Sequence, residues 1–312
     1  MSDLTDLARA SPRTMPERFA MNGTAEIFQS HRPRLFGVAY RMLGSRADAE
    51  DILQDAYLRW HQSYTEDIES PIAFLITMTT RLCLDRLRKL KEERARYVGV
   101  WLPEPIVDDH IPSPEMQREL ADEVSIAFLA ILERLGPEER AAFLLHEVFD
   151  YDYPEVAQMI GKAEPACRQM IHRARARVRE SRPRFSVTEE SRERMLAKFL
   201  AAVSSGDRKA VMALLAEDVE YMADGGGKVV AALKVLRGPE RIGWLYHCIA
   251  RRFTGLTYRL IRVNEELGAV VMMDGRLFSI LSFVTDGQRV CGIYNVRNPD
   301  KLGGVALRDL AA

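Results

Sequence analysis

The spacing of apolar residues changes near Glu217, and this change restricts the fold more than any other feature of the sequence. Upstream, from about Met21, apolar residues recur every three or four positions, as in amphipathic helices. Downstream, four strand-like runs lie among turn signals such as Asp274-Gly275 and Asp286-Gly287. They cover residues 258–263, 268–273, 277–285 and 290–296. The chain is therefore predicted to be multidomain, with two all-α domains followed by an α+β domain.

Breaks in the helical pattern divide the chain further, as expected for 312 residues, which exceed one typical domain. Residues 97–114 hold four prolines and few helix signals, so a linker is expected there. The helical pattern is also interrupted at Gly44-Ser45 and at Glu69-Ser70-Pro71. The predicted divisions are a flexible tail at 1–20, a helical domain at 21–96, the linker at 97–114, a second helical domain at 115–182, a short linker at 183–190 and a C-terminal domain at 191–312, which begins with two helices split at 204–207.

Composition excludes several classes of protein. Hydrophobic residues at 47% and charged residues at 29% are ordinary for a globular protein and argue against a disordered or fibrous chain. The longest apolar-rich stretch, 268–284, is interrupted by Asp274 and Arg276, and the first twenty residues lack the apolar core of a signal peptide. No membrane segment is expected, and the protein should stay in the cytoplasm. The four cysteines stand far apart, so neither a zinc site, a disulfide framework nor a cofactor is predicted.

Charge is distributed unevenly, although the formal net charge is only −1. Residues 162–184 contain eight Lys or Arg against two Glu, and residues 81–96 contain seven against three acids. Nucleic-acid binding depends on such local fields more than on net charge. The two basic segments are therefore candidate DNA-binding surfaces.

The sharpest functional signal is a helix-turn-helix pattern at residues 153–182. Pro154 suits the first turn of a helix, Gly161 permits the turn, and a second helix is expected to begin near Pro165. Its predicted core face carries Ala166, Met170, Ala174 and Val178, whereas Arg168, Arg175, Arg179 and Arg182 form a stripe on another face. A solvated basic helix has the same stripe, but the preceding helix and turn favour DNA binding. The candidate contacts, base edges first and phosphates later, are Glu164, Pro165, Arg168, Gln169, His172, Arg173, Arg175 and Arg179.

A second signal is an acidic helix face at residues 45–60. Ser45 is placed to cap a helix whose apolar face holds Ala49, Ile52, Leu53, Ala56, Tyr57 and Trp60. Acidic residues lie on the other side, where they either only favour the helix N-terminus and solvation or dock on a basic partner. The candidate docking residues are Asp48, Glu50, Asp51, Gln54 and Asp55.

The third signal is the helix predicted at 72–91, which has one apolar side and one basic side that also carries threonines. Such a surface suits the phosphates of melted or duplex DNA, although a basic face alone is often only solvated. Its pairing with the helix-turn-helix strengthens the DNA-binding interpretation. The candidate residues are Thr80, Arg81, Asp85, Arg86, Arg88 and Lys89.

Taken together, these segments resemble extracytoplasmic function sigma factors of the sigma-70 family. Residues 34–60, with Arg-Ala-Asp-Ala-Glu-Asp at 46–51, look like region 2, and residues 71–88 resemble the segment that opens and reads the −10 element. Residues 135–179 are similar to region 4, which binds the −35 element. The resemblance implies core RNA polymerase, at its β′ clamp and β flap, and promoter DNA as partners. Arg81 stands where many members have Asn, which leaves the base preference at that point open.

The C-terminal third resembles the SnoaL-like, NTF2-like extension of one subgroup of these sigma factors. The subgroup signatures Trp-Leu-Pro-Glu-Pro, Asp-Gly-Gly-Gly-Lys and Asn-Pro-Asp-Lys-Leu are complete here. The resemblance implies that the extension contacts region 2 or the linker and modulates activity. Physically, a Pro-rich segment loses little entropy on docking, and three glycines suit a surface loop, positive φ or close backbone approach. The matched residues are Trp101, Leu102, Pro103, Glu104, Pro105, Asp224, Gly225, Gly226, Gly227, Lys228, Asn298, Pro299, Asp300, Lys301 and Leu302.

Other functions remain open at this point. Catalysis in the third domain would use Tyr221, Asp224, Tyr246 or His247, but nothing in the sequence brings these side chains together, so an enzyme is not predicted. Binding of a small, unidentified ligand is the stronger alternative for this domain. A helix-turn-helix repressor with a ligand domain would need no acidic docking face. An NTF2-like enzyme with a DNA-binding appendage would need a pocket with a perturbed carboxylate or His.

Overall fold

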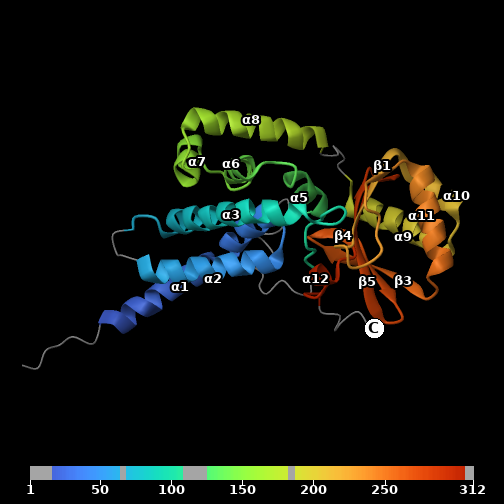
Figure 1. The fold of residues 1–312 in the computed structure, drawn as a ribbon, viewed down its shortest axis with the longest axis horizontal. Coiled ribbons are helices and arrows are strands. Elements are labelled where there is room, and N and C mark those ends of the chain that lie inside the picture. The colour runs from blue at the N-terminus through green and yellow to red at the C-terminus, as the bar shows by residue number, and fades with distance from the viewer. Residues whose placement is uncertain (1–15, 64–67, 108–124, 182–186, 306–312) are drawn as a thin grey trace, which may run out of the picture.

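The computed structural model describes residues 16–63, 68–107, 125–181 and 187–305. A helical half and a sheet-containing half lie side by side, and residues 97–107 of the linker run between them (Figure 1). The predicted fold class, helical domains followed by an α+β domain, is confirmed. The rest of the predicted linker and most of the predicted N-terminal tail lie outside the described residues.

The first helical unit consists of α1 (Pro16–Leu43), α2 (Arg46–Ser63) and α3 (Pro71–Ala95). Both expected interruptions are present, because Gly44 adopts φ +66° between α1 and α2, and Ser70 caps α3 ahead of Pro71. The Ser45 hydroxyl accepts from the Asp48 amide at 3.2 Å, as its capping position predicts. Helix α1 begins at Pro16, inside the segment predicted as a tail.

The second helical unit consists of α5 (Ile126–Leu132), α6 (Pro137–Glu147), α7 (Tyr153–Ile160) and α8 (Glu164–Ser181). Asp152 and Glu155 form a capping box at the start of α7, and Gly161 ends that helix at φ +69°. Met170, Ala174 and Val178 are buried as predicted. The prediction that Ala166 belongs to the core face is wrong, because Ala166 is exposed. Cys167 and Ile171 are buried beside the other predicted residues, so the core face of α8 is rotated from its predicted position.

The two helical units share one hydrophobic core that runs from Phe28 to Val178. A buried guanidinium ties them together, because Arg140 of α6 donates to Glu133 at 2.6 Å and to the Met42 carbonyl of α1 at 2.5 Å. Shared apolar burial and a paired buried charge make these seven described helices one packed body.

The sheet domain begins with α9 (Glu189–Ser205) and α10 (Arg208–Ala213), the two helices expected there. Its six strands are β1 (Leu215–Asp224), β2 (Leu236–Arg237), β3 (Leu256–Val263), β4 (Glu266–Met273), β5 (Arg276–Thr285) and β6 (Val290–Val296), ordered β2-β1-β6-β5-β4-β3. Only β1 and β6 pair in parallel. All four predicted strands are confirmed, whereas β1 and β2 were not predicted.

The sheet buries both faces. One face packs under α9 and α11 (Pro239–Arg252), where Phe199, Tyr246 and Ile293 are buried (Figure 1). The other face packs on the linker, α5 and α12 (Pro299–Leu302) through residues that include Leu102 and Val296. The linker lies between the sheet and the helices and forms contacts with both.

Candidate nucleic-acid interface and linker junction

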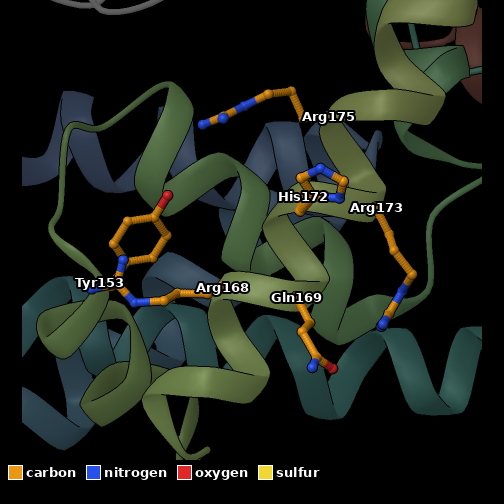
Figure 2. A pocket seen from close by; sticks show the side chains of 6 residues that line it. All are labelled: Tyr153, Arg168, Gln169, His172, Arg173 and Arg175. Carbon is orange, nitrogen blue, oxygen red and sulfur yellow. The ribbon is translucent and has the colours of Figure 1, made fainter.

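Helix α8 exposes Arg168 and Arg179 of the predicted arginine stripe and partly exposes Arg175, whereas Arg182 lies outside the described residues. A hollow of about 420 Å³ lies beside this helix, lined by Tyr153 of α7 and by Arg168, Gln169, His172, Arg173 and Arg175 of α8. Figure 2 shows these six side chains. The guanidinium carbon of Arg168 lies 4.1 Å from the centroid of the Tyr153 ring, a cation–π contact that orients the side chain. Pro165 and Arg179 are also exposed.

The arginines of α8 pair with glutamates of the same helical unit. Arg168 pairs with Glu164 at 2.6 Å and Arg173 with Glu139 at 3.2 Å, and Arg175 pairs with Glu147. Half of the Arg168 and Arg173 side-chain surface is exposed, at 55% and 52%. Exposed pairs of this kind contribute little to stability, so these arginines can exchange their glutamates for phosphates. Sequence reasoning missed Arg177, which also reaches Glu139, although it belongs to the same basic segment.

The basic face of α3 is partly covered by α7. Arg81 donates to the Met159 and Gln158 carbonyls, each at 3.1 Å, and Thr80 is fully buried. Arg88 pairs with Asp85 at 2.8 Å, and Lys89 is exposed. In this arrangement Thr80 cannot reach DNA, and Arg81 is held by helix carbonyls.

The acidic face of α2 is only partly free. Asp51, Gln54 and Asp55 are exposed, as a docking surface requires. Glu50 pairs with Arg32, and Asp48 accepts from Arg86 at 2.8 Å. The pKa of Arg86 is raised, because the hydrogen bond to Asp48 and the charges of Asp48 and Glu93 outweigh its partial burial. A candidate polymerase contact and a candidate DNA contact are thus paired with each other.

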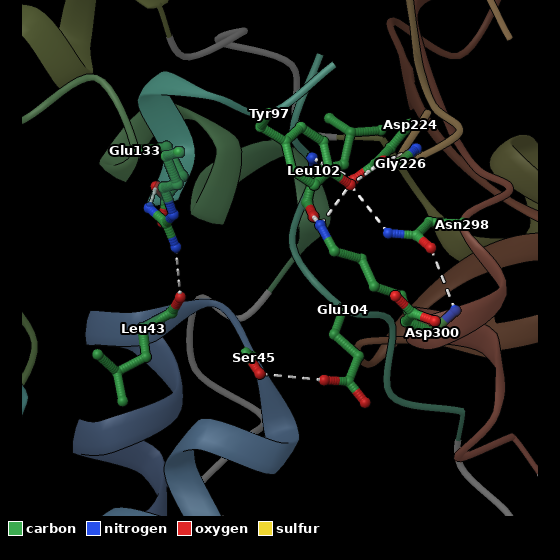
Figure 3. Close-up of polar contacts among 12 residues, drawn as sticks. Leu43, Ser45, Tyr97, Leu102, Glu104, Glu133, Asp224, Gly226, Asn298 and Asp300 are labelled. Atoms are coloured by element: carbon green, nitrogen blue, oxygen red, sulfur yellow. Dashed lines mark hydrogen bonds and ion pairs between the residues drawn. The ribbon is translucent and has the colours of Figure 1, made fainter. Parts of the chain in front are cut away.

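The three signature segments meet in what we call the linker junction: residues 97–106 against 224–228 and 298–302 (Figure 3). Asp224, with 0% of its side chain exposed, is the central acceptor. It receives the Leu102 amide at 2.8 Å, the Tyr97 hydroxyl at 2.5 Å and the Gly226 amide at 3.0 Å. Three donors from two segments of the chain therefore converge on this one buried carboxylate.

Lys301 supplies the counter-charge. Its ammonium group lies 2.6 Å from Asp224 Oδ2, donates to the Leu102 carbonyl and sits 3.8 Å from the centroid of the Trp101 ring. Burial lowers the pKa of Lys301 to about 8, although the Asp224 carboxylate opposes that change. This buried pair fixes Trp101 and Leu102 of the linker to α12.

The glycine run is required for close approach, not for a free loop. Gly226 has φ +62°, and a Cβ at that position would lie 2.4 Å from the Asn298 side-chain amide. Gly227, at φ +70°, packs against Val98 of the linker. Asn298 in turn donates to the Tyr97 hydroxyl at 2.9 Å. Lys228 and Asp300 add an exposed ion pair at 2.5 Å.

Glu104 connects the linker to the acidic helix. Its Oε2 atom accepts from the Arg46 amide at 2.8 Å and the Ser45 hydroxyl at 3.3 Å, so the linker helps to cap α2 (Figure 3). The Glu104 amide also donates to the Gly44 carbonyl at 2.8 Å, and Pro103 and Pro105 are buried around it. The Trp-Leu-Pro-Glu-Pro segment therefore contacts the sheet domain and α2 at the same time.

Asn264, in the turn between β3 and β4, is a junction residue that sequence reasoning missed. Its side chain accepts from the Ile106 amide at 2.9 Å and donates to the Tyr40 hydroxyl of α1 at 2.7 Å. Its residue type is the signal that the sequence offers, since Asn favours turns and tolerates the positive φ of 52° found here.

The candidate catalytic residues do not converge. Asp224 faces the linker, and His247 lies 3.2 Å from the Gly206 carbonyl and stacks on Trp244. Only Tyr221 and Tyr246 approach each other, with ring centroids 6.2 Å apart. Within the described ranges, no cluster of His, Cys, Asp or Glu is arranged to hold a metal ion, and no helix has the length and apolar character to cross a membrane.

An exposed arginine-rich recognition helix, packed with a second helical unit and joined to an α+β domain, defines a multidomain DNA-binding transcription protein. The profiles for Sigma-70 region 2 and Sigma-70, region 4 match residues 27–93 and 125–178. The ECF RNA polymerase sigma factor SigJ of Mycobacterium tuberculosis is 36% identical over 300 residues, covering 91% of this chain and 95% of the relative. The chain belongs to the extracytoplasmic function (ECF) family of RNA polymerase sigma factors.

Two further comparisons agree with this assignment. The probable ECF sigma factor SigI of Mycobacterium tuberculosis is 34% identical over 255 residues, covering 79% of this chain and 87% of the relative. The crystal structure of Mycobacterium tuberculosis SigJ superposes with a TM-score of 0.74 at 34% identity and covers 91% of this chain and 100% of that one. The C-terminal α+β domain is therefore part of a shared architecture.

Proposed function

We propose that this chain directs core RNA polymerase to −35 and −10 promoter elements and that its NTF2-like domain sets how readily it does so. The observation that carries the first part is the exposed arginine face of α8, whose ion pairs are weak enough to be replaced by DNA phosphates. Asp51, Gln54 and Asp55 of α2 are the residues proposed to dock on the β′ clamp, and region 4 is proposed to meet the β flap. The protein would act in the cytoplasm, where the polymerase works.

The described arrangement fits a closed state of this sigma factor. Arg81 is bonded to α7, Thr80 is buried, and the two helical units share one core. Promoter elements read by regions 2 and 4 are separate sites on the DNA, so both regions can bind only after α3 and α7 move apart. We propose that Arg81, Asp85, Arg86, Arg88 and Lys89 engage the −10 region after this opening.

The linker junction is the proposed point of control. The linker is bonded to Asp224, Asn264 and Lys301 of the NTF2-like domain, while Glu104 caps α2. A change in the position of the sheet domain is therefore transmitted through the linker to α2, the helix proposed to bind polymerase. We propose regulation within one chain, and a non-enzymatic NTF2-like domain, since its candidate catalytic groups lie apart.

The test is transcription in vitro with the full-length protein, core polymerase and a genomic fragment library. Promoter-specific transcripts that need both proteins are expected. Arg168→Ala is expected to reduce them, whereas Arg208→Ala, which removes an exposed arginine of the sheet domain, is the matched control. Tight operator binding without polymerase, together with no transcripts, would instead favour a helix-turn-helix repressor with a ligand domain.

A further inference from the structure

A polar cluster lies inside the NTF2-like domain, on the sheet face opposite the linker junction. Tyr221 of β1 accepts a hydrogen bond from the Asn295 amide of β6 at 2.8 Å. Tyr246 of α11 meets the Tyr221 ring edge-on, at 82° between the ring planes. Arg297 follows β6 and contributes to the electrostatics around Tyr221. None of these side chains takes part in the DNA or polymerase surfaces described above.

Two buried atoms of this cluster have no hydrogen-bond partner among the described residues. They are the Tyr246 hydroxyl and the Asn295 Oδ1 atom, on side chains that are 3% and 7% exposed. Buried polar atoms in folded proteins are nearly always paired, with protein, water or ligand. One of the two atoms offers a proton and the other accepts one.

Arg297 adds a positive charge that faces no carboxylate in the described part of the chain. Its Nη1 atom donates to the Val230 carbonyl, its guanidinium carbon lies 4.0 Å from the Phe278 ring centroid, and its buried Nε atom is unpaired. Burial lowers the pKa of Arg297, while Tyr221 acts in the opposite direction. A half-buried guanidinium with a free donor is the side chain best suited to receive a carboxylate.

The Tyr246 hydroxyl, the Asn295 Oδ1 atom and the Arg297 guanidinium together indicate one ligand chemistry. A hydroxyl group can both accept from Tyr246 and donate to Asn295 Oδ1, and a carboxylate is the partner that Arg297 lacks. We propose that this face of the NTF2-like domain binds a small hydroxy acid, held by Arg297 at its carboxylate and by Tyr246 and Asn295 at its hydroxyl.

The strands that carry the cluster also carry the linker junction. Tyr221 and Asp224 belong to β1, and the Arg297 amide donates to the Asp224 carbonyl at 2.7 Å. Asn298, which contacts Tyr97 of the linker, follows Arg297 directly. Binding would therefore be sensed at the junction; this consequence rests on the proposed function, but the binding site does not.

Binding is tested by calorimetry on the full-length protein with two probes of different size, lactate and 4-hydroxybenzoate. Propionate and benzoate lack the hydroxyl, and lactamide and 4-hydroxybenzamide lack the charge, so the wild-type protein alone tests both parts of the proposal. We expect at least one hydroxy acid to bind roughly tenfold or more tightly than its two analogues. The proposal is overturned if neither acid gives a heat of binding, as expected for a site filled only with water. It is also overturned if an acid and its analogues bind equally.

Variants then locate the site. Tyr246→Phe and Arg297→Met are each expected to weaken binding of that acid by roughly tenfold or more. Tyr294→Phe is the matched control, since Tyr294 is the neighbour of Asn295 and packs with the linker-side cluster. Because the Tyr246 hydroxyl has no partner in the described part of the chain, Tyr246→Phe should not lower the melting temperature of the ligand-free protein. If Tyr294→Phe weakens binding of the acid equally, or if the other two variants do not weaken it, the ligand binds elsewhere and the assignment is contradicted.

Discussion

Helix α8 and the linker junction both depend on charged side chains, but they use them in opposite ways. On α8, Arg168 and Arg173 are about half exposed and pair with glutamates of their own helical unit. At the junction, Lys301 and Asp224 of the sheet domain are 10% and 0% exposed, and both bond to Leu102 of the linker. Exposed pairs contribute about 0–1 kcal/mol, whereas removing one partner of a buried pair costs about 3–5 kcal/mol.

The difference suggests a division of labour. The exposed arginines of α8 form weak ion pairs and can bind another partner. The buried charged side chains of the junction hold the domains together. Substitutions on α8 should therefore change DNA binding without changing the fold, and substitutions at the junction should change how the domains are held. The following predictions test that division from the largest effect to the smallest.

The largest effect is expected for Lys301→Met, which leaves the Asp224 carboxylate buried without its counter-charge. Because three other donors still reach Asp224, the cost should lie near the lower limit for a broken buried pair, about 3 kcal/mol. Urea unfolding monitored by Trp fluorescence measures the change in the free energy of unfolding. Lys228→Met removes the exposed Lys228–Asp300 pair of the same junction and should cost less than about 1 kcal/mol. Equal costs for the two variants would remove the distinction between buried and exposed charge.

The next effect concerns the contact between α3 and α7. Arg81→Ala removes two hydrogen bonds from a charged group to helix carbonyls, and we expect about 2 kcal/mol less resistance to opening. Hydrogen exchange of the amides in residues 153–160 measures this opening. Lys89→Ala, an exposed change on the same helix, should leave exchange unaltered. If these amides are equally protected from exchange in the Arg81 variant, shared apolar packing alone holds α7 against α3.

Raising the pH should stabilise docking of the sheet domain. Docked Lys301 has a pKa of about 8, mainly because of burial, compared with 10.5 when solvated. Between these values the undocked state binds more protons, so the docked state gains stability as the pH rises, by at most about 1.4 kcal/mol per pH unit. Unfolding measured across this window should show the gain in the wild type and not in Lys301→Met. A decrease with rising pH in the wild type alone would show that attraction to Asp224, not burial, dominates.

The smallest effect on the protein itself is expected at α8. Arg179→Ala should leave the melting temperature unchanged, since Arg179 is exposed. It should weaken promoter binding by the polymerase complex and reduce the slope of log affinity against log salt by about one. Arg208→Ala should change neither quantity. An altered melting temperature with unaltered salt dependence would make Arg179 a structural residue.

The sequence predicted most reliably what is local. Pro154 in the first turn of α7, the Gly161 turn and the Asp274-Gly275 turn depend on neighbouring residues, and all are present. Strand β1 was not predicted, because acidic residues break its apolar run and its partner β6 lies far along the chain. Ala166 was misplaced because helical spacing alone could not show how far α8 is rotated against α6.

The linker junction shows the limit most clearly. Its signature residues were selected from the family resemblance, but their bonds were not predictable, since Asp224 and Leu102 are 122 residues apart. Asn264 and Tyr40 are 224 residues apart, and no local pattern marks either as half of a pair. Glu104 likewise caps a helix that ended long before it in the sequence. Contacts of this kind follow from the assembled fold, not from spacing.

The most direct test of the account is promoter-specific transcription by full-length Asp224→Ala and Asn298→Ala with core polymerase. Lys228→Met serves as the matched control, and hydrogen exchange of α1 to α3 confirms that region 2 stays folded. The account predicts that both junction variants change transcript yield relative to the wild type, while the control does not. Wild-type yield from both junction variants would contradict it, because the sheet domain would then be docked without controlling the sigma factor.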